Sequence, residues 1–255
     1  MNTTNSPDEP IRSDAEDLLD RKGFARAISD LIVDAQKGET LRIGVYGAWG
    51  EGKTSVLELV QAQLEAAGHV TVFLYAWSYR STNELLEDLL RKIARKLKIP
   101  TRGLSWDKAL WFVKIGRQGA SLDPLSKAAD VVLGQAIETV FGHLFSRLKA
   151  RAAAALLTAI RQKLGDHKLM VFVDDLDRVR PDVLPELLLT LREVLNQPDF
   201  FYILALAPDV VRDGLMSSNV KWGDTTRFLE KIVELPRQLP APSQVALAHF
   251  VSIQV

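Results

Sequence analysis

The chain has 255 residues, 47% of them hydrophobic, and its 32 Lys and Arg residues balance its 32 Asp and Glu residues. This length supports one sizeable hydrophobic core, and the balanced charge gives no reason to expect strong attraction to nucleic acid or to anionic lipid. The chain has no cysteine, which excludes disulfides, thiolate metal sites and a cysteine nucleophile.

The N-terminal residues are polar and acidic and contain no apolar signal core. We expect residues 1–13 to form a disordered tail. We also expect a cytoplasmic location, because the sequence lacks both an export signal and the roughly 18 uninterrupted apolar residues of a membrane span. Ala15 to Gln36 has apolar residues at helical spacing and predicts a helix that leads into the first half of the domain, residues 14–99. Within this segment, Leu19 and Phe24 either line an adenine pocket or pack against the next helix.

A β-branched apolar run, a glycine-bracketed loop and a helical pattern follow one another from Leu41 to Val60. The loop has the spacing of a phosphate-binding loop, in which glycines adopt positive φ and successive backbone N–H groups surround phosphate oxygens. Lys53 supplies an ammonium group for the β- and γ-phosphates, and the hydroxyl of Thr54 can ligate Mg²⁺. A purely structural glycine-rich turn is the alternative, but chance seldom supplies the motif with both flanks. The expected nucleotide-binding residues are Gly47, Ala48, Trp49, Gly50, Glu51, Gly52, Lys53, Thr54 and Ser55.

Strand and helix patterns alternate after the loop, which predicts a parallel sheet covered on both faces. The expected elements are a helix from Ser55 to Ala67, a strand from Val70 to Ala76, a helix from Thr82 to Leu97 capped by Ser81 or Thr82, a strand from Leu169 to Val173, a helix from Pro185 to Asn196, a strand from Phe200 to Ala207, a helix from Asp209 to Met216, and a possible fifth strand from Ile232 to Leu235. The fold class is therefore α/β, a P-loop NTPase three-layer αβα sandwich with a mainly parallel five-stranded sheet and an inserted helical segment. We assign residues 168–240 to the second half, and residues 241–255 to the start of a C-terminal helical region that is truncated or absent.

Residues 100–167 separate the two halves and predict a helical insertion. Its apolar residues at helical spacing are Leu133, Ile137, Val140, Phe141, Leu144 and Leu148. Leu144 to Lys163 also carries basic residues beside alanine and leucine. We favour an ordinary packed helix with a solvated basic face over an interfacial helix that would give the protein peripheral membrane contact.

The segment Leu169 to Arg178, LMVFVDDLDR, is an apolar strand that ends in adjacent carboxylates, where doubly wound sheets place their chemistry. We assign Asp174 to Mg²⁺ beside Thr54, because Mg²⁺ keeps several waters and takes few protein ligands. Asp175 could orient or deprotonate the attacking water. Asp177 and Arg178 support this site or contact a neighbouring subunit. An acidic loop that caps the next helix is the alternative for both strand-end carboxylates. The expected catalytic residues are Lys53, Asp175 and Arg178.

The strand from Phe200 ends at Ala207, where a polar sensor of the γ-phosphate would be expected. Asp209 either takes that role one turn later or is an ordinary charge in the first turn of a helix. Trp49 and Trp77 could stack on a base or on nucleic acid, but we expect Trp77 to pack between the sheet and the insertion. Other candidate arginine fingers, which the sequence does not rank, are Arg180, Arg212 and Arg227.

Four segments together resemble the KAP family of P-loop NTPases. They are RIGVYGAWGEGKTS around the loop, FLYAWSY at Phe73 to Tyr79, VDDLDR at Val173 to Arg178, which resembles the Walker B element of the family, and FLEKIVELPRQLP at Phe228 to Pro240. The resemblance implies an ATP-binding core with an extra strand between the phosphate-loop strand and the Walker B strand. It also implies a group that is often membrane-associated and whose bacterial members are linked to anti-phage defence. The chain departs from the family in three ways: no transmembrane helix in the insertion, no Asp at position 207, and little chain after the last strand.

We therefore predict a P-loop NTPase that binds ATP and Mg²⁺ and hydrolyses ATP as a switch or motor for a protein partner or for further copies of itself. The alternative is a nucleotide-binding assembly module that cannot hydrolyse ATP unaided, as Ala207 and the short C-terminal region suggest. A phosphotransferase is disfavoured because the insertion has no acceptor signature. A GTPase is disfavoured because no Asn-Lys-x-Asp motif follows the Walker B element.

Overall fold

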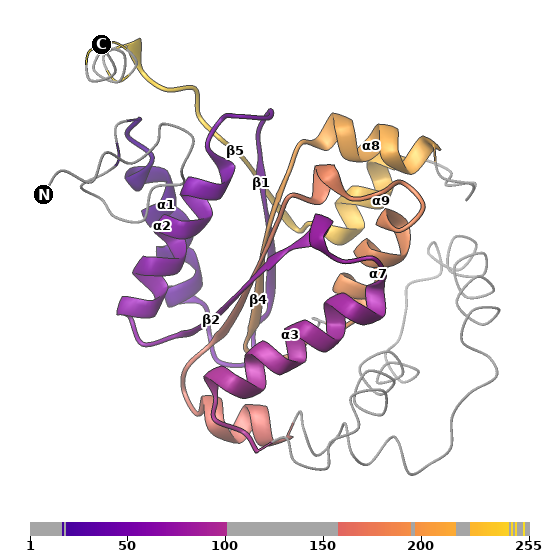
Figure 1. Cartoon of the computed structure of the whole chain (residues 1–255). Coiled ribbons are helices and arrows are strands. Elements are labelled where there is room, and N and C mark those ends of the chain that lie inside the picture. Colours follow the sequence, from indigo (N-terminus) through magenta and orange to yellow (C-terminus); the bar gives the residue numbers. More distant parts are fainter. Residues whose placement is uncertain are drawn as a thin grey trace, which may run out of the picture.

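Figure 1 shows the computed structural model of the chain, which describes residues 17, 19–100, 158–194, 197–217 and 225–244 and the single residues 246, 248 and 252. The predicted tail, most of the insertion and most of the C-terminal region lie outside these residues. The described elements, in chain order, are α1 (Lys22–Asp34), β1 (Leu41–Tyr46), α2 (Lys53–Ala66), β2 (Val70–Tyr75), η2 (Ala76–Ser78), α3 (Thr82–Lys96), β3 (Leu169–Asp174), η3 (Leu176–Arg178), α7 (Leu184–Val194), β4 (Phe200–Leu206), α8 (Pro208–Ser217), α9 (Thr225–Ile232) and β5 (Leu235–Gln238).

The described strands form one five-stranded sheet in the order β2-β3-β4-β1-β5, and every neighbouring pair is parallel. β4 lies between β1 and β3, so the strand that leads into the loop and the strand that ends in carboxylates are not neighbours. This arrangement confirms the extra strand that the family resemblance implied. Because all the strands run the same way, their carboxyl ends meet at one edge of the sheet.

Two separate cores cover the two faces of the sheet. Alternate residues of each strand point to opposite faces, which divides the side chains between the cores. Ile43, Phe172 and Ile203 pack with α1 and α2 on one face, whereas Val72 and Leu204 pack with α3, α7, α8 and α9 on the other. Figure 1 shows the two groups of helices on opposite sides of the sheet. The predicted αβα sandwich is confirmed.

The predicted helix at Ala15 begins only at Lys22 in the structure. Asp20 has a left-handed backbone with φ +55°, which is incompatible with a continuous helix, and the carboxylate of Asp17 accepts the N–H groups of Arg21 and Lys22. Phe24 is partly buried against the core shared by α1 and α2, which agrees with the packing role.

The fifth strand is displaced from its predicted position. Ile232 is the last residue of α9, and β5 runs from Leu235 to Gln238 through Pro236. Proline cannot donate a ladder hydrogen bond and is largely confined to edge strands. Within the sheet that the structure describes, β5 pairs only with β1 and is an edge strand, so it tolerates the proline.

The last part of the predicted insertion is helical at residues 158–164. Ile160 and Leu164 are buried in the core that α3 and α7 share, so this turn of helix belongs to the packed domain. Among the described residues, none of the helices combines the length and the apolar character needed to cross a membrane.

Candidate functional site

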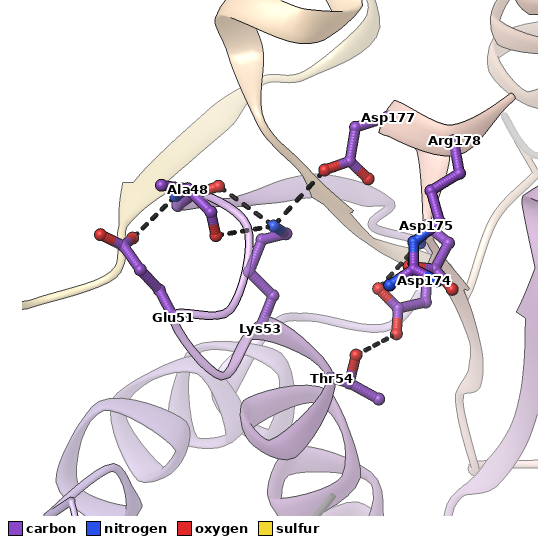
Figure 2. Close-up of polar contacts among 9 residues, drawn as sticks. Ala48, Glu51, Lys53, Thr54, Asp174, Asp175, Asp177 and Arg178 are labelled. Carbon is purple, nitrogen blue, oxygen red and sulfur yellow. Dashed lines mark hydrogen bonds and ion pairs between the residues drawn. The ribbon is translucent and has the colours of Figure 1, made fainter. Parts of the chain in front are cut away.

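The loop between β1 and α2 turns through two left-handed glycines. Gly50 has φ +81° and Gly52 has φ +86°, and a Cβ added at either would meet no atom within 4 Å. At Gly47 an added Cβ would lie 2.8 Å from Oε2 of Glu51, so a larger residue there would displace that carboxylate. That carboxylate accepts the N–H of Ala48 at 2.8 Å and braces the loop (Figure 2). Gly52 is the N-cap of α2, so the loop ends at the positive end of that helix.

Lys53 reaches back over the loop that precedes it. Its side chain is only 8% exposed, and its Nζ donates to the carbonyl oxygens of Gly47 at 3.1 Å and Ala48 at 3.0 Å. The same ammonium lies 3.5 Å from Oδ2 of Asp177, which follows β3 (Figure 2). A buried cation therefore stands between the loop and the carboxylates of the neighbouring segment.

Thr54 and Asp174 meet at the carboxyl edge of the sheet although 120 positions separate them. The hydroxyl of Thr54 donates to Oδ2 of Asp174 at 2.6 Å, and the N–H of Asp175 donates to Oδ1 of Asp174 at 2.8 Å. Asp174 is 1% exposed, and burial raises its pKa above that of an ordinary aspartate, although both hydrogen bonds act in the opposite direction. A hydroxyl and a carboxylate so close together are a ligand pair suited to a small hard cation.

Asp175 occupies an unusual backbone conformation at the end of β3. Its φ is +58°, in the left-handed region that L residues other than Asn and Asp seldom adopt. Burial raises the pKa of Asp175, although the positive charge of Arg178 acts in the opposite direction. The Nε of Arg178 lies 2.9 Å from the carboxylate of Asp175. The guanidinium of Arg178 also lies over the ring of Trp49, 4.9 Å from its centroid. The acid at the strand end is thereby linked to the tip of the loop.

The structure therefore brings together the loop, Lys53, Thr54 and the carboxylates that follow β3 (Figure 2). Ser55 lies in the first turn of α2. The prediction that Trp77 packs between the sheet and the insertion is wrong, because its side chain is 56% exposed. β2 ends at Tyr75 and η2 turns the chain at the sheet edge, where the indole hydrogen-bonds with Asp175.

Asp209 and Arg180 fall outside this group. Asp209 is the second residue of α8, where it is largely exposed and pairs with Arg212 at 2.9 Å, so it is a first-turn helix charge rather than part of the site. Arg180 pairs with Asp182, its near neighbour. The side chain of Arg227 lies outside the described residues.

One residue at the site was missed in the sequence. Arg21 precedes α1 and donates from Nη2 to the carbonyl of Glu51 at 3.1 Å and from Nη1 to the carbonyl of Pro240. These partners lie 30 and 219 positions away, and no local pattern links a lone arginine to carbonyl groups at such distances.

The sequence matches the model of the KAP family P-loop domain over residues 21–254. The chain belongs to the KAP family. Membership confirms the resemblance and makes this KAP chain a nucleotide-binding P-loop domain.

A relative of this KAP chain is the Phage T7 exclusion protein of Escherichia coli strain K12, which is 28% identical over 263 residues. The match covers 90% of the chain and 34% of the relative, so the chain spans about a third of that protein's length. Among solved structures, the Orc1 protein of Aeropyrum pernix in complex with DNA superposes with a TM-score of 0.47 at 12% identity, covering 97% of this chain and 51% of that one. DnaI superposes with a TM-score of 0.38 at 14% identity, covering 86% of this chain and 81% of that one.

Proposed function

We propose that this KAP domain binds ATP together with Mg²⁺ and hydrolyses it to switch or drive a protein partner or further copies of the chain. The contact of 2.6 Å between Thr54 and Asp174 carries this proposal. It joins the first turn of α2 to the end of β3 and so unites the phosphate loop with the carboxylate strand.

The loop fits a chain of phosphates. Gly50 and Gly52 leave space where a Cβ would otherwise project, and the N–H groups at the start of α2 have no intrahelical partners. Lys53 donates to neutral carbonyl oxygens, and charged phosphate oxygens are stronger acceptors for an ammonium group. We expect Lys53 to exchange its loop carbonyls for the β- and γ-phosphates when ATP binds.

The pair Thr54 and Asp174 fits Mg²⁺, because both offer oxygen atoms and few protein ligands are needed. Bound there, Mg²⁺ would neutralise charge on the phosphate oxygens. The backbone N–H of Asp175 holds Oδ1 of Asp174 and leaves Oδ2 toward Thr54, which orients the carboxylate.

Asp175 is the proposed base for the attacking water. Burial raises its pKa, which makes the carboxylate a stronger proton acceptor once it is ionised. The ion pair with Arg178 opposes this, so the base works best when that arginine turns toward developing charge on the γ-phosphate.

A nucleotide-binding module without hydrolysis is the second candidate. Two observations favour it: β4 is followed by Ala207, which offers no polar group to the site, and Asp175 is held in an ion pair. The two candidates share every binding residue and differ only in the fate of the γ-phosphate.

Isothermal titration and phosphate-release assays, run over a range of protein concentrations, test both candidates. Lys53→Ala should weaken Mg²⁺-ATP binding at least about tenfold, because a charge-assisted contact is lost. Asp175→Asn should spare binding and abolish phosphate release. Lys37→Ala, at an exposed lysine paired with Asp166, is the matched control and should change neither.

Each outcome separates the candidates. Binding without phosphate release by the wild-type chain would favour the module, and release that rises faster than protein concentration would indicate a site completed between copies. Unchanged ATP affinity in Lys53→Ala would contradict the site itself.

We also propose that the domain serves phage exclusion. The relative named for excluding phage T7 supports this, although the chain spans only about a third of it. The plating efficiency of phage T7 is the corresponding measurement.

A further inference from the structure

Arg21 is a buried charge held by carbonyl groups. Its side chain is 3% exposed, its Nη2 donates to the carbonyl of Glu51 at 3.1 Å, and its Nη1 donates to the carbonyl of Pro240. Its Nε is buried and has no hydrogen-bond partner among the described residues. Burial lowers the pKa of Arg21 although the charges of Glu51 and Asp17 act in the opposite direction, so the two carbonyl contacts and these carboxylates only partly offset the cost of removing the charge from water. This arrangement therefore needs a reason other than stability.

The carbonyl of Glu51 belongs to the peptide bond that joins Glu51 to Gly52. The described residues contain no cis peptide, and in a planar trans peptide the C=O and the following N–H point in opposite directions. By holding the carbonyl of Glu51, Arg21 fixes the direction of the Gly52 N–H. A charged donor on the carbonyl also polarises the peptide and makes that N–H a stronger donor.

Gly52 is a position where this control matters. Gly52 has a left-handed backbone with φ +86°, and glycine can adopt many other backbone conformations because it has no Cβ. It is also the N-cap of α2, next to Lys53 and Thr54. A contact that fixes this peptide plane therefore fixes the junction between the loop and the helix.

The second carbonyl ties the same guanidinium to the end of β5. The N–H of Leu239 donates to the carbonyl of Tyr46 at 2.7 Å, so the segment that contains Pro240 runs beside the start of the loop. Asp17 accepts the backbone N–H of Arg21 at 2.9 Å and holds the residue in place. The guanidinium of Arg21 thus joins the end of the loop, at Glu51, to the segment that follows β5, at Pro240.

We propose that Arg21 is a positioning residue for phosphate binding, which sets the Gly52 N–H in the direction that a phosphate oxygen requires before the nucleotide arrives. This inference rests on the proposed binding of ATP by the loop. It assigns Arg21 no direct contact with the nucleotide.

The test compares Arg21→Met and Arg21→Lys with Arg42→Met. Arg42 lies at the opposite end of β1 from the loop, is also mostly buried, also has a buried Nε without a partner, and pairs with Glu234. By isothermal titration, Arg21→Met should bind Mg²⁺-ATP about tenfold more weakly, the effect of one strong hydrogen bond. Arg21→Lys, which keeps the charge but not the fork, should fall between this variant and the wild type. Arg42→Met should keep wild-type affinity even if its denaturation midpoint falls.

The Gly52 amide supplies a readout that general destabilisation would not move. In ¹⁵N–¹H spectra, the Gly52 resonance should shift in Arg21→Lys while the resonances of the β3 residues stay in place. If Arg21→Met does not fold, Arg21→Lys decides the matter by its affinity and its spectrum.

The failures are distinguishable. A wild-type chain that does not bind Mg²⁺-ATP would overturn both the proposed function and this inference. Binding that is lost in Lys53→Ala but stays within about twofold of wild type in both Arg21 variants would overturn the role of Arg21 alone.

Discussion

At the residue scale, the buried carboxyl group of Asp174 in the candidate site lowers the free energy of unfolding at neutral pH. Burial raises the pKa of its carboxyl group, so the folded protein holds a proton there more tightly than the unfolded chain does. The stability that this difference contributes is fully present below the ordinary aspartate range, near pH 4, and is lost as the pH rises through the folded-state pKa. At neutral pH the ionised carboxylate is therefore a destabilising group.

Asp174→Asn should accordingly stabilise the fold at pH 7 in the presence of EDTA by roughly 1 kcal/mol, as is common when a strained functional group is replaced. Asparagine can still accept the N–H of Asp175 and can donate to the hydroxyl of Thr54. Urea denaturation at pH 7 and pH 4 checks this, with Asp182→Asn on the surface as the control. A variant that is less stable than wild type at pH 7, or a difference that does not shrink at pH 4, would contradict the argument.

At the scale of elements, Lys168 fastens the end of α1 to the start of β3. Its side chain is buried, and its Nζ donates to the carbonyl oxygens of Ile32, Val33 at 2.8 Å and Ala35 at 2.7 Å. These groups lie at the C-terminal end of the helix, where a cation also interacts favourably with the negative end of the helix dipole. The ammonium lies 5.5 Å from the ring centroid of Phe201, which adds a cation–π contact.

Lys168→Met should lower the free energy of unfolding by about 2 kcal/mol, because it keeps the aliphatic stem but leaves the helix-end carbonyls without their donor. Burial lowers the pKa of Lys168, so the cost of desolvating its ammonium group offsets part of the free energy that its hydrogen bonds contribute. Equilibrium urea denaturation measures the change, and Lys37→Met, at an exposed lysine, should have little effect. Equal losses in the two variants would show that the helix-end contacts contribute nothing specific.

The elements that the sequence predicted well are those with a local physical signal. The loop was predicted because glycine spacing reports left-handed backbone, and Gly50 and Gly52 have that conformation. Asp174 was predicted to lie beside Thr54 because it ends a buried apolar strand, and the carboxyl ends of parallel strands meet at the same edge of the sheet. The position of β5 was missed because Pro236 signals a strand end unless the strand is known to lie at an edge. Arg21 was missed because its partners are fixed only by the tertiary fold.

At the scale of the whole molecule, the candidate site is built from two halves of the chain. The loop and Lys53 come from the first half, and the carboxylates from Asp174 to Asp177 come from the second. Neither half contains a complete site, and β4 separates the two strands that carry it.

Escherichia coli cells that express the natural protein containing this domain should plate phage T7 less efficiently than cells without it. Lys53→Ala and Asp175→Asn should restore plating, because under the proposed function one removes phosphate binding and the other removes hydrolysis. Immunoblots must show equal protein levels. If both variants still excluded the phage as well as the wild type, exclusion would not depend on the proposed ATPase activity.

The strand order also has a consequence for the biosynthesis of the protein. Among the described strands, β2 pairs only with β3, and β1 pairs only with β4 and β5, so neither early strand has a partner in the described part of the first half. In β2, Tyr75 is aligned with Asp174, which the ribosome adds 99 residues later. At about 5–20 residues per second, translation leaves both strands unpaired for several seconds. During that interval the nascent chain carries two apolar strands with open edges, which makes it prone to aggregation until the second half has been translated.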